Sequence, residues 1–363
     1  MKPHQFIHPG FTLNGLSYSI EELVNFVHDL AEIGAEYEVD LSEFLLNWFD
    51  ESEVITVSTS GSTGEPKSVL LLKQHMIESA KATGSYLDLE VGVSALLCLS
   101  TGYIAGKMMV VRALTLGWTL HITAPSKDAL VEYDNNYDFV AMVPYQVSNS
   151  ISALDKVKKI LIGGGVVSKQ LEAKLQDVSS EIFVSYGMTE TCTHVAIQRL
   201  NGANKQSFFQ ALPNIEFSTD SRGCLVIDAP KIAHEQVVTN DLVILQSSHS
   251  FTWLGRYDTI INTGGVKINP ENVEATLAPY IKSPFFIASE SDSILGERII
   301  LVVEKINTQI QSQVEVSSYS TMFSELGNYE RPKKIYYVSK FIYTETGKIK
   351  RNEVLELLKK YKK

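Results

Sequence analysis

The alternation of apolar and polar positions predicts two kinds of element along the chain. Close to the N-terminus, residues 19–22 and 40–43 both resemble capping boxes, and the apolar residues nearby recur at helical spacing, which predicts two short helices. From residue 54 onward, short apolar runs typical of buried strands alternate with helix-like runs. This alternation predicts a mostly parallel sheet covered by helices. After a first strand at 54–57, the predicted strands span 95–99, 119–123, 139–143, 159–162 and 182–185, and the predicted helices span 74–86, 104–116 and 168–177.

The pattern of predicted strands and helices changes twice in the later part of the chain. Residues 203–253 contain short β-like runs without helices between them, which indicates a smaller β-rich layer. After Asp258 come a Gly-Gly turn, a helix that opens at Pro270, two further strands and a terminal helix from residue 351. Because a single hydrophobic core rarely grows beyond about 250–300 residues, we place a domain boundary near Asp258. The predicted fold class is α/β, with a large domain at 1–257 and a small α+β domain at 258–363.

Composition and charge narrow the classes of function. Apolar residues make up 44% of the chain and charged residues 20%, and no apolar run approaches the roughly 18 residues of a membrane helix. The net charge of −10 argues against a nucleic-acid-binding surface. The first residues lack the apolar core of a signal peptide, so we expect a cytoplasmic protein. The three cysteines are far apart and have neither disulfide nor metal-site spacing.

The stretch richest in candidate chemistry is 56–68, which places hydroxyl side chains, two glycines and a lysine in one loop. Hydroxyls and backbone N–H groups donate to anionic oxygens, and the lysine adds positive charge, so the composition predicts a phosphate-binding loop. It is not the usual nucleotide P-loop, because Pro66 precedes the lysine and no Gly-Lys-Ser/Thr opens a helix. A flexible linker is the alternative interpretation. The candidate residues are Thr59, Ser60, Gly61, Ser62, Thr63, Gly64 and Lys67.

Two further predicted strands end in turns with candidate binding groups. One ends in three glycines, where a flat ring can lie against bare backbone at the carboxyl edge of a parallel sheet. The next ends in an aromatic residue, followed by a hydroxyl suited to phosphate and a carboxylate suited to Mg²⁺. Taken singly, the glycines could form an ordinary turn and the carboxylate could lie on the surface. The candidates are Gly163, Gly164, Gly165, Tyr186, Gly187, Thr189 and Glu190.

Three more candidates lie further along the chain. The carboxylate of Asp241 can accept both hydroxyls of a ribose, and Arg256, a short distance later, can reinforce sugar or phosphate binding. Singly, both are more often members of surface ion pairs. Near the end of the chain, Lys348 follows a glycine in a polar turn. A lone Gly-Lys is common, but the order and spacing of all these segments are not.

The order and spacing of these segments resemble the adenylate-forming superfamily of acyl-CoA synthetases, luciferases and peptide-synthetase adenylation domains. The resemblance runs from residue 54 to residue 351, on the motifs 58–67, 186–190, 241, 255–258, 264–271 and 347–351. It implies a ligase that uses ATP and Mg²⁺ to convert a small-molecule carboxylic acid to an acyl-adenylate and then passes the acyl group to CoA. It also implies that the small C-terminal domain is mobile.

The resemblance implies a role for each motif that would hold the nucleotide. The hydroxyl-rich loop with Lys67 would hold the β- and γ-phosphates, and Thr189 would contact the α-phosphate. Glu190 would bind Mg²⁺. The glycines at 163–165, with Tyr186 and the glycine after it, would frame adenine.

The remaining implied roles concern the ribose and the domain rotation. Asp241 and Arg256 would hold the ribose. Asp258 matches the hinge, and Lys348 matches the lysine that stabilises charge on the pentavalent phosphorus during adenylation. After rotation, the segment with Gly265 would replace that lysine so that the CoA thiolate can attack the acyl-adenylate.

Within the superfamily, residues 185–192 and the compact length most resemble the o-succinylbenzoate–CoA ligase family of menaquinone biosynthesis. That substrate is an aromatic acid with two carboxylates, so its pocket needs an apolar slot and a donor or cation for the carboxylate that does not react. Our candidates are Tyr103 and Gly106 as pocket wall, and Lys107 and His194 as donors. Arg112 is an alternative counter-charge, unless it only closes an ion pair.

Two other functions stay open at this point. The acid could be another aryl or short acyl acid, with CoA or a carrier protein as acceptor. The chain could also be a non-catalytic adenylate-binding protein, because the stretch before the phosphate loop is much shorter than in most members. We expect the missing N-terminal subdomain to be replaced by a homodimer partner or by a simplified fold.

Overall fold

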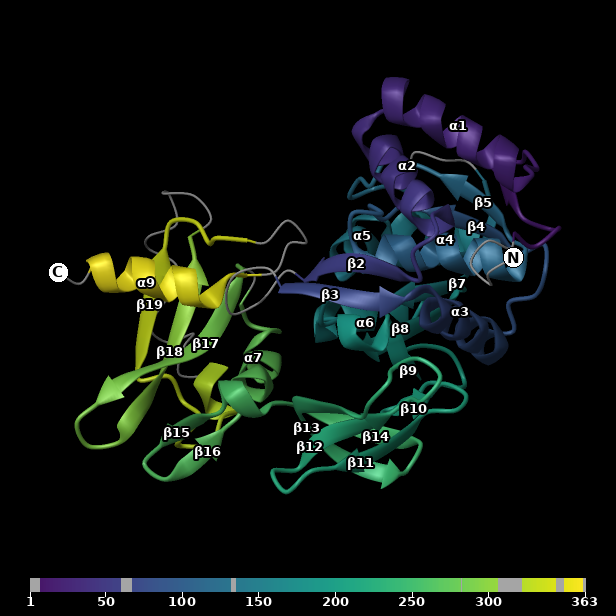
Figure 1. Ribbon diagram of the computed structural model, residues 1–363. Helices are drawn as coiled ribbons and strands as arrows, with labels where there is room; N and C mark the ends of the chain where they lie inside the picture. Colours follow the sequence, from purple (N-terminus) through teal and green to yellow (C-terminus); the bar gives the residue numbers. More distant parts are fainter. Residues whose placement is uncertain are drawn as a thin grey trace.

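The computed structural model describes residues 7–59, 67–131, 135–281, 283–305, 322–343 and 349–361 (Figure 1). In these ranges the chain forms one large sheet, one smaller sheet and a separate two-stranded hairpin. Helices cover the large sheet, so the predicted α/β fold class is confirmed. No helix in the described ranges is long and apolar enough to cross a membrane.

The first helix, α1 (Ile20–Ile33), begins where the sequence predicts it. The Ser19 hydroxyl accepts from the Glu22 backbone N–H at 3.2 Å, and the Glu22 carboxylate accepts from the Ser19 N–H at 2.8 Å. Both halves of the capping box are therefore present, and the prediction at 19–22 is confirmed.

The second helix, α2 (Glu36–Phe49), begins earlier than predicted, so the capping box proposed at 40–43 is wrong. Residues 40–43 lie inside the helix. Gly34 ends α1, and the Glu38 carboxylate reaches back to accept from the Ala35 N–H at 2.8 Å. This single bond satisfies one orphan donor at the start of α2, although Ala35 has no side-chain acceptor of its own.

A sheet of 12 strands runs through the larger part of the chain in the order β1-β5-β4-β6-β7-β8-β9-β10-β14-β13-β12-β11. Pairing is parallel as far as β8 and antiparallel beyond it. The β-rich region predicted at 203–253 therefore extends the same sheet. The parallel strands are β1 (Thr12–Leu13), β4 (Ser94–Leu97), β5 (Thr119–Ile122), β6 (Tyr137–Met142), β7 (Val157–Ile162) and β8 (Glu181–Gly187). The antiparallel strands are β9 (His194–Arg199), β10 (Phe209–Ala211), β11 (Glu216–Thr219), β12 (Cys224–Asp228), β13 (Val237–Ser247) and β14 (Ser250–Arg256).

Both faces of the parallel half are buried, which explains its nearly continuous apolar runs. Phe139 and Phe183 pack on one face with α1 and α2 and with α3 (Lys73–Leu87) and α4 (Ile104–Leu116). Val140 and Ile182, their neighbours in sequence, pack on the other face with α5 (Pro144–Asn149) and α6 (Lys169–Leu175). The carboxyl ends of β6, β7 and β8 consequently open at one edge of a rigid sheet, where a binding site is expected.

The strand predicted at 54–57 does not join the large sheet. It is part of β2 (Val54–Thr59), which pairs antiparallel with β3 (Lys67–Leu72) in a two-stranded hairpin of its own. Ile55, Val57 and Leu71 bury one face of this hairpin in the core cluster that also contains residues of α1 to α4. The prediction that this strand belongs to the mostly parallel sheet is therefore wrong, because it pairs only with β3 and is buried against the core.

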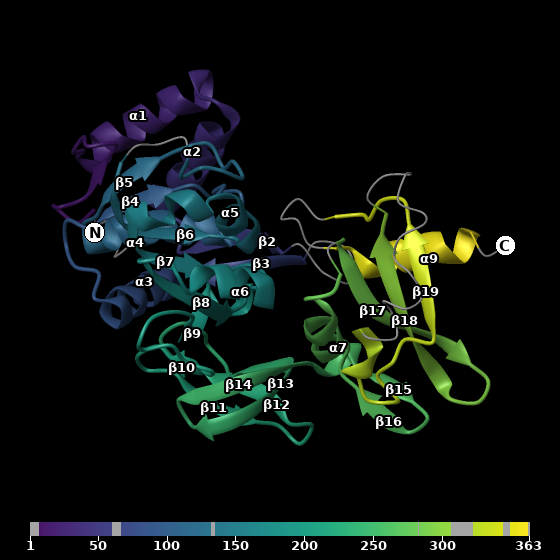
Figure 2. The same cartoon turned by 180° about the vertical axis from the view of Figure 1, so that it is seen from behind.

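A second sheet follows residue 260 and forms a separate lobe in both views (Figure 1, Figure 2). The main chain reaches it through a short turn at Tyr257–Thr259, where the sequence predicts the domain boundary. Independent movement of the two parts stays a prediction. The sheet contains β15 (Ile261–Thr263), β16 (Val266–Ile268), β17 (Phe285–Asp292), β18 (Gly296–Glu304) and β19 (Lys334–Val338), with α7 (Pro270–Leu277) and α9 (Arg351–Tyr361) beside it.

Candidate active site

The glycine turn after β7 presents bare backbone at the carboxyl edge of the sheet. The Gly163 N–H donates to the Met142 carbonyl at 3.0 Å, so this residue still belongs to the ladder with β6. Gly164 has a φ of +75°, a conformation that side chains other than glycine's rarely adopt. A Cβ at Gly163 would lie 2.9 Å from the Ser185 hydroxyl. Glycine is therefore favoured at Gly163 by the close approach of Ser185 and at Gly164 by its backbone conformation. The contact of this turn with adenine stays a prediction.

Tyr186 and Asp241, both predicted to hold the nucleoside, are brought into direct contact. The Tyr186 hydroxyl donates to Asp241 Oδ2 at 2.8 Å, and the Trp253 indole N–H donates to Asp241 Oδ1 at 3.0 Å. Asp241 is only 8% exposed. Burial, together with the negative charge of Asp241, raises the pKa of Tyr186 well above its usual range, so its hydroxyl stays a donor. The sequence reasoning did not identify Trp253.

Arg256 and Asp258 form an ion pair with each other. Arg256 Nε donates to Asp258 Oδ1 at 2.8 Å and the terminal nitrogen donates to Oδ2 at 2.6 Å, a bidentate arrangement. This pair lowers the pKa of Asp258 and raises that of Arg256. Arg256 also lies directly opposite Asp241 in the β13–β14 ladder. The predicted ribose residue and the predicted hinge residue are therefore partners in this structure.

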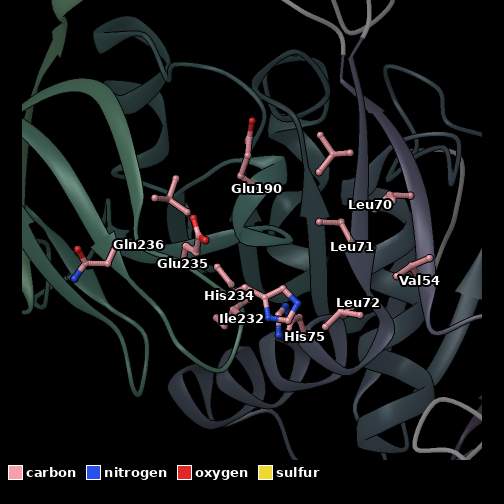
Figure 3. Close-up of a pocket in the computed structure, with 13 residues that line it drawn as sticks. Val54, Leu70, Leu71, Leu72, His75, Glu190, Ile232, His234, Glu235 and Gln236 are labelled. Carbon is pink, nitrogen blue, oxygen red and sulfur yellow. The ribbon is translucent and has the colours of Figure 1, made fainter.

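Glu190 lies beyond the end of β8 in a short 3-10 turn, Thr189–Thr191, and its side chain is exposed. It lines a cleft of about 560 Å³ between β3 and residues 232–237 (Figure 3). His75 and His234 line the same cleft, and their ring centroids lie 4.7 Å apart. Burial, and to a smaller extent the charge of His234, lower the pKa of His75.

The residues around Glu190 fit Mg²⁺ only as an ion shared with substrate phosphates. No group of three or more His, Cys, Asp or Glu side chains in the described ranges is arranged to hold a metal ion. Mg²⁺ usually keeps several waters and binds one or two carboxylates together with substrate phosphates. Glu190, exposed beside Thr189, can supply such a carboxylate if phosphates provide the other ligands.

Several predicted residues lie at or beyond the limits of the described chain. Residues 60–66 and Lys348 are outside it, and Thr59 and Lys67 enter only as the ends of the hairpin strands. Gly265 lies in the β15–β16 turn with a φ of +83°, on the second sheet. The phosphate-binding, lysine and CoA roles therefore stay predictions.

The structure separates the two candidate donors for the acid. Lys107 faces α2, where its ammonium donates to the Thr101 carbonyl and lies 5.1 Å from the centre of the Phe44 ring. There it lines a different cleft, of about 410 Å³, with Asp40 and Glu43. His194 is instead buried among α3, α4 and β9. Lys107 and His194 therefore lie in different environments and do not form one binding site for the acid.

The two remaining pocket candidates are Gly106 and Tyr103, and both lie at the start of α4. A Cβ at Gly106 would lie 2.2 Å from the Ser100 carbonyl oxygen, so glycine is needed there for the close approach of α4 to the preceding turn. Tyr103 precedes the first residue of α4 as its N-cap, without a side-chain capping bond. Neither observation places them against a substrate.

His194 is held by Thr83 and Arg112. Thr83 Oγ1 donates to the Ser79 carbonyl at 3.0 Å, so it accepts from His194 Nε2 at 3.1 Å, which assigns the ring proton to Nε2. Nδ1 is then the acceptor that faces the Arg112 guanidinium at 3.5 Å. Burial and the charge of Arg112 lower the pKa of His194 well below its ordinary value, so the imidazole is neutral.

Arg112 is the unusual member of this cluster, because it is buried without a counter-ion. Its side chain is 2% exposed, and no carboxylate pairs with it in the described part of the chain. Burial lowers its pKa to about 9. His194 pairs with Gly187 in the β8–β9 ladder, so the cationic cluster lies one strand away from the Tyr186–Glu190 motif. The sequence signal was present, since Arg112 directly follows the apolar run 108–111 within α4.

The fold and the site define a class of protein. A family model described as AMP-binding enzyme matches residues 36–219, half of the chain, and the chain belongs to this family. The superfamily predicted from the motifs is therefore confirmed.

Individual relatives place the chain more closely. It is 35% identical to an acyl-CoA synthetase (AMP-forming)/AMP-acid ligase II-like protein from Dyadobacter fermentans, whose crystal structure it matches with a TM-score of 0.60 over 92% of this chain and 98% of that chain. It is 24% identical to the 2-succinylbenzoate–CoA ligase of Enterococcus faecalis over 92% of this chain and 76% of that protein. The chain also matches the structure of the o-succinylbenzoate CoA synthetase of Bacillus subtilis in complex with its acyl-adenylate intermediate. The TM-score is 0.70 at 20% identity, over 82% of this chain and 68% of that chain, and this likeness shows the fold.

Proposed function

We propose that the protein is an ATP-dependent acid–CoA ligase that works through an acyl-adenylate, and that its acid is o-succinylbenzoate. Family membership and the relatives named 2-succinylbenzoate–CoA ligase support the reaction class. A Bacillus subtilis relative has been solved with ATP and a magnesium ion, which supports the use of both. The observation that carries the choice of acid is the buried guanidinium of Arg112, which pairs with no carboxylate in the described ranges.

A buried cation without a partner suits a substrate that carries its own second carboxylate. Removing an ion from water costs several kcal/mol, and only a counter-ion or good hydrogen bonds offset that cost. Among the residues that the structure describes, Arg112 has two hydrogen bonds, both long, of 3.4 Å to Thr83 and 3.5 Å to His194. A dicarboxylic acid would neutralise it while leaving the other carboxylate free to react. A fatty acid has no group for this site.

The remaining residues divide the two steps between them. In the first step an oxygen of the reacting carboxylate attacks the α-phosphorus of ATP and pyrophosphate leaves, with Thr189 at the α-phosphate and Lys348 stabilising the developing charge. Mg²⁺, held by Glu190, would neutralise phosphate charge. In the second step the CoA thiolate attacks the acyl carbonyl and AMP leaves, after rotation about Asp258. Homodimer formation and a cytoplasmic location stay predictions from the sequence.

The test is pyrophosphate release by the purified full chain with ATP, Mg²⁺, CoA and a panel of acids. The panel compares o-succinylbenzoate with its monomethyl esters, benzoate and short fatty acids, since an ester keeps the shape and removes one charge. A charge-assisted hydrogen bond contributes about 1.5–3 kcal/mol, so we expect o-succinylbenzoate to exceed the better monoester in kcat/KM by about 10–150-fold.

Two matched variants test which residue pairs with the second carboxylate of the acid. Arg112→Met should lower that preference to near one, whereas Lys107→Met, the same change at the other candidate cation, should leave it intact. Faster turnover of fatty acids than of o-succinylbenzoate would refute the choice of acid. Absence of pyrophosphate release with every acid would refute the ligase and favour a non-catalytic adenylate-binding protein.

A further inference from the structure

The carboxylate of Asp241 is held by two donors from two different strands. Tyr186 reaches it from β8 and Trp253 from β14, each bonding a different oxygen, at 2.8 and 3.0 Å. One such bond would leave the carboxylate free to turn about its Cβ–Cγ bond. Two bonds to two oxygens fix its plane, and the side chain is buried, so the orientation is set before any ligand arrives.

We propose that Trp253 is a positioning residue for nucleotide binding, which orients Asp241 so that the carboxylate receives the two ribose hydroxyls of ATP. The proposal rests on the proposed function and adds a residue to it. A carboxylate has about four lone-pair directions, two on each oxygen. Tyr186 and Trp253 occupy one on each, which leaves one acceptor direction on each oxygen. A ribose carries two adjacent hydroxyl donors, which match these two acceptors.

A β-bulge brings Trp253 to the face of Asp241. Asp241 pairs with Arg256 and Leu242 pairs with Gly255, but Val243 then pairs with Trp253, so Leu254 has no partner. In a regular ladder Val243 would face Leu254, and Trp253 would point to the opposite side of the sheet. The extra residue shifts the alternation by one position. Trp253 therefore shares a face with Asp241.

The bulge is built into the structure by two further contacts. Gly255 has a φ of +135°, and a Cβ there would lie 1.9 Å from Asn269 Nδ2, so only glycine fits. Asn269 Nδ2 donates to the Leu254 carbonyl at 2.6 Å, which satisfies the acceptor that the bulge removes from the ladder. A bulge secured in this way next to a binding residue is typical of a device that aims a side chain.

The hydrogen bond distinguishes Trp253 from a tryptophan that only fills space. Trp118 is fully buried in the core, and its indole N–H meets no hydrogen-bond partner among the described residues. Trp253 is less buried, yet its N–H meets a carboxylate. Trp118→Phe is therefore a matched control, because it makes the same chemical change where no carboxylate is affected.

The test compares the affinity of the full chain for Mg·ATP with its affinity for 2′-deoxy-ATP and 3′-deoxy-ATP, by calorimetry without any acid. Hydrogen bonds to a charged group are worth about 1.5–3 kcal/mol, so the wild type should prefer ATP by about 10–150-fold. Trp253→Phe should weaken ATP binding and reduce this preference several-fold. Trp118→Phe should lower the melting temperature and leave the preference unchanged. An unchanged preference in Trp253→Phe would overturn the proposal, whatever happens to its stability.

A second measurement does not depend on the variant folding. In the wild type labelled with ¹⁵N-tryptophan, the Trp253 indole N–H resonance should shift with ATP and much less with 2′,3′-dideoxy-ATP, and equal shifts would refute the role. The outcomes also separate the two proposals. A wild type that binds ATP with the expected preference but does not use o-succinylbenzoate refutes only the proposed acid, whereas one that does not bind ATP refutes both.

Discussion

Replacing Arg112 with methionine should stabilise the unliganded protein. The guanidinium is 2% exposed, and burial lowers its pKa from 12.5 to about 9. Since one pKa unit corresponds to about 1.4 kcal/mol, the folded protein disfavours the charged form by on the order of 5 kcal/mol. Methionine has a similar length and no charge, so it removes this cost and keeps apolar packing.

The expected gain in stability is smaller than this cost. The variant loses two long hydrogen bonds, to Thr83 and His194, each worth at most about 1 kcal/mol at 3.4–3.5 Å. His194 Nδ1 keeps the Thr193 hydroxyl at 3.4 Å as a donor. We therefore expect the free energy of unfolding to rise by about 1–3 kcal/mol, within the range observed when buried charges are replaced by apolar side chains.

The effect should depend on pH in one direction. The pKa of Arg112 is lower in the folded than in the unfolded state, so below pH 9 both states carry the proton and the cost is complete. Above about pH 9 the folded state binds fewer protons, and the wild type gains stability relative to the variant as pH rises. The advantage of Arg112→Met should be constant near neutral pH and shrink above about pH 9.

Urea denaturation with and without o-succinylbenzoate measures both parts of this argument. The variant should be more stable alone and should gain less stability from the acid than the wild type does. Arg199→Met is the matched control, because Arg199 pairs with Glu181 at 3.0 Å and lies 5.7 Å from the centre of the Phe183 ring. It should lose stability and keep its response to the acid. A less stable Arg112→Met, or one stabilised by the acid as the wild type is, would refute the reasoning.

Two further substitutions test the predicted chemistry. Lys348→Ala should slow acyl-adenylate formation by about 10²–10³-fold, in line with the loss of one preorganised charge, while thioester formation from supplied acyl-adenylate survives. Rapid-quench assays of each half-reaction measure both rates, and equal losses would contradict the role assigned to Lys348. Gly187→Ala places a Cβ 2.1 Å from the Thr193 carbonyl oxygen, so β8 and β9 should separate beside Tyr186 and ATP affinity should fall by about tenfold or more. Unchanged affinity by calorimetry would show that the strands can absorb the methyl group.

Local signals predicted much of the fold. The capping box at Ser19 and the apolar runs of the parallel strands mark their own elements, because each depends on neighbours in sequence. The start of α2 was misplaced because Ala35 offers no capping side chain. The pairing of β2 with β3 instead of the sheet depends on burial in a core built from residues far apart in sequence, which no local pattern encodes.

The candidate site was predictable where one residue carries its own chemistry. Tyr186 and Asp241 were named from their types and positions, and the structure places them in contact. Lys107 was named for its charge, but its direction depends on how α4 packs on α2. Trp253 was missed because its face is set by a bulge. The glycine that follows Leu254 within the strand was the only sequence signal for that bulge.

The separate hairpin of β2 and β3 divides the expected nucleotide site between two independently hydrogen-bonded elements. The glycine turn, Tyr186 and Asp241 all lie on one continuous hydrogen-bonded sheet, so the surface expected to hold the nucleoside can deform only by breaking ladder bonds. The strands that border the expected phosphate loop form ladder bonds only with each other. If the predicted roles hold, the base and sugar of ATP would be bound by the continuous sheet and its phosphates by the end of a separately hydrogen-bonded hairpin that packs on the same core.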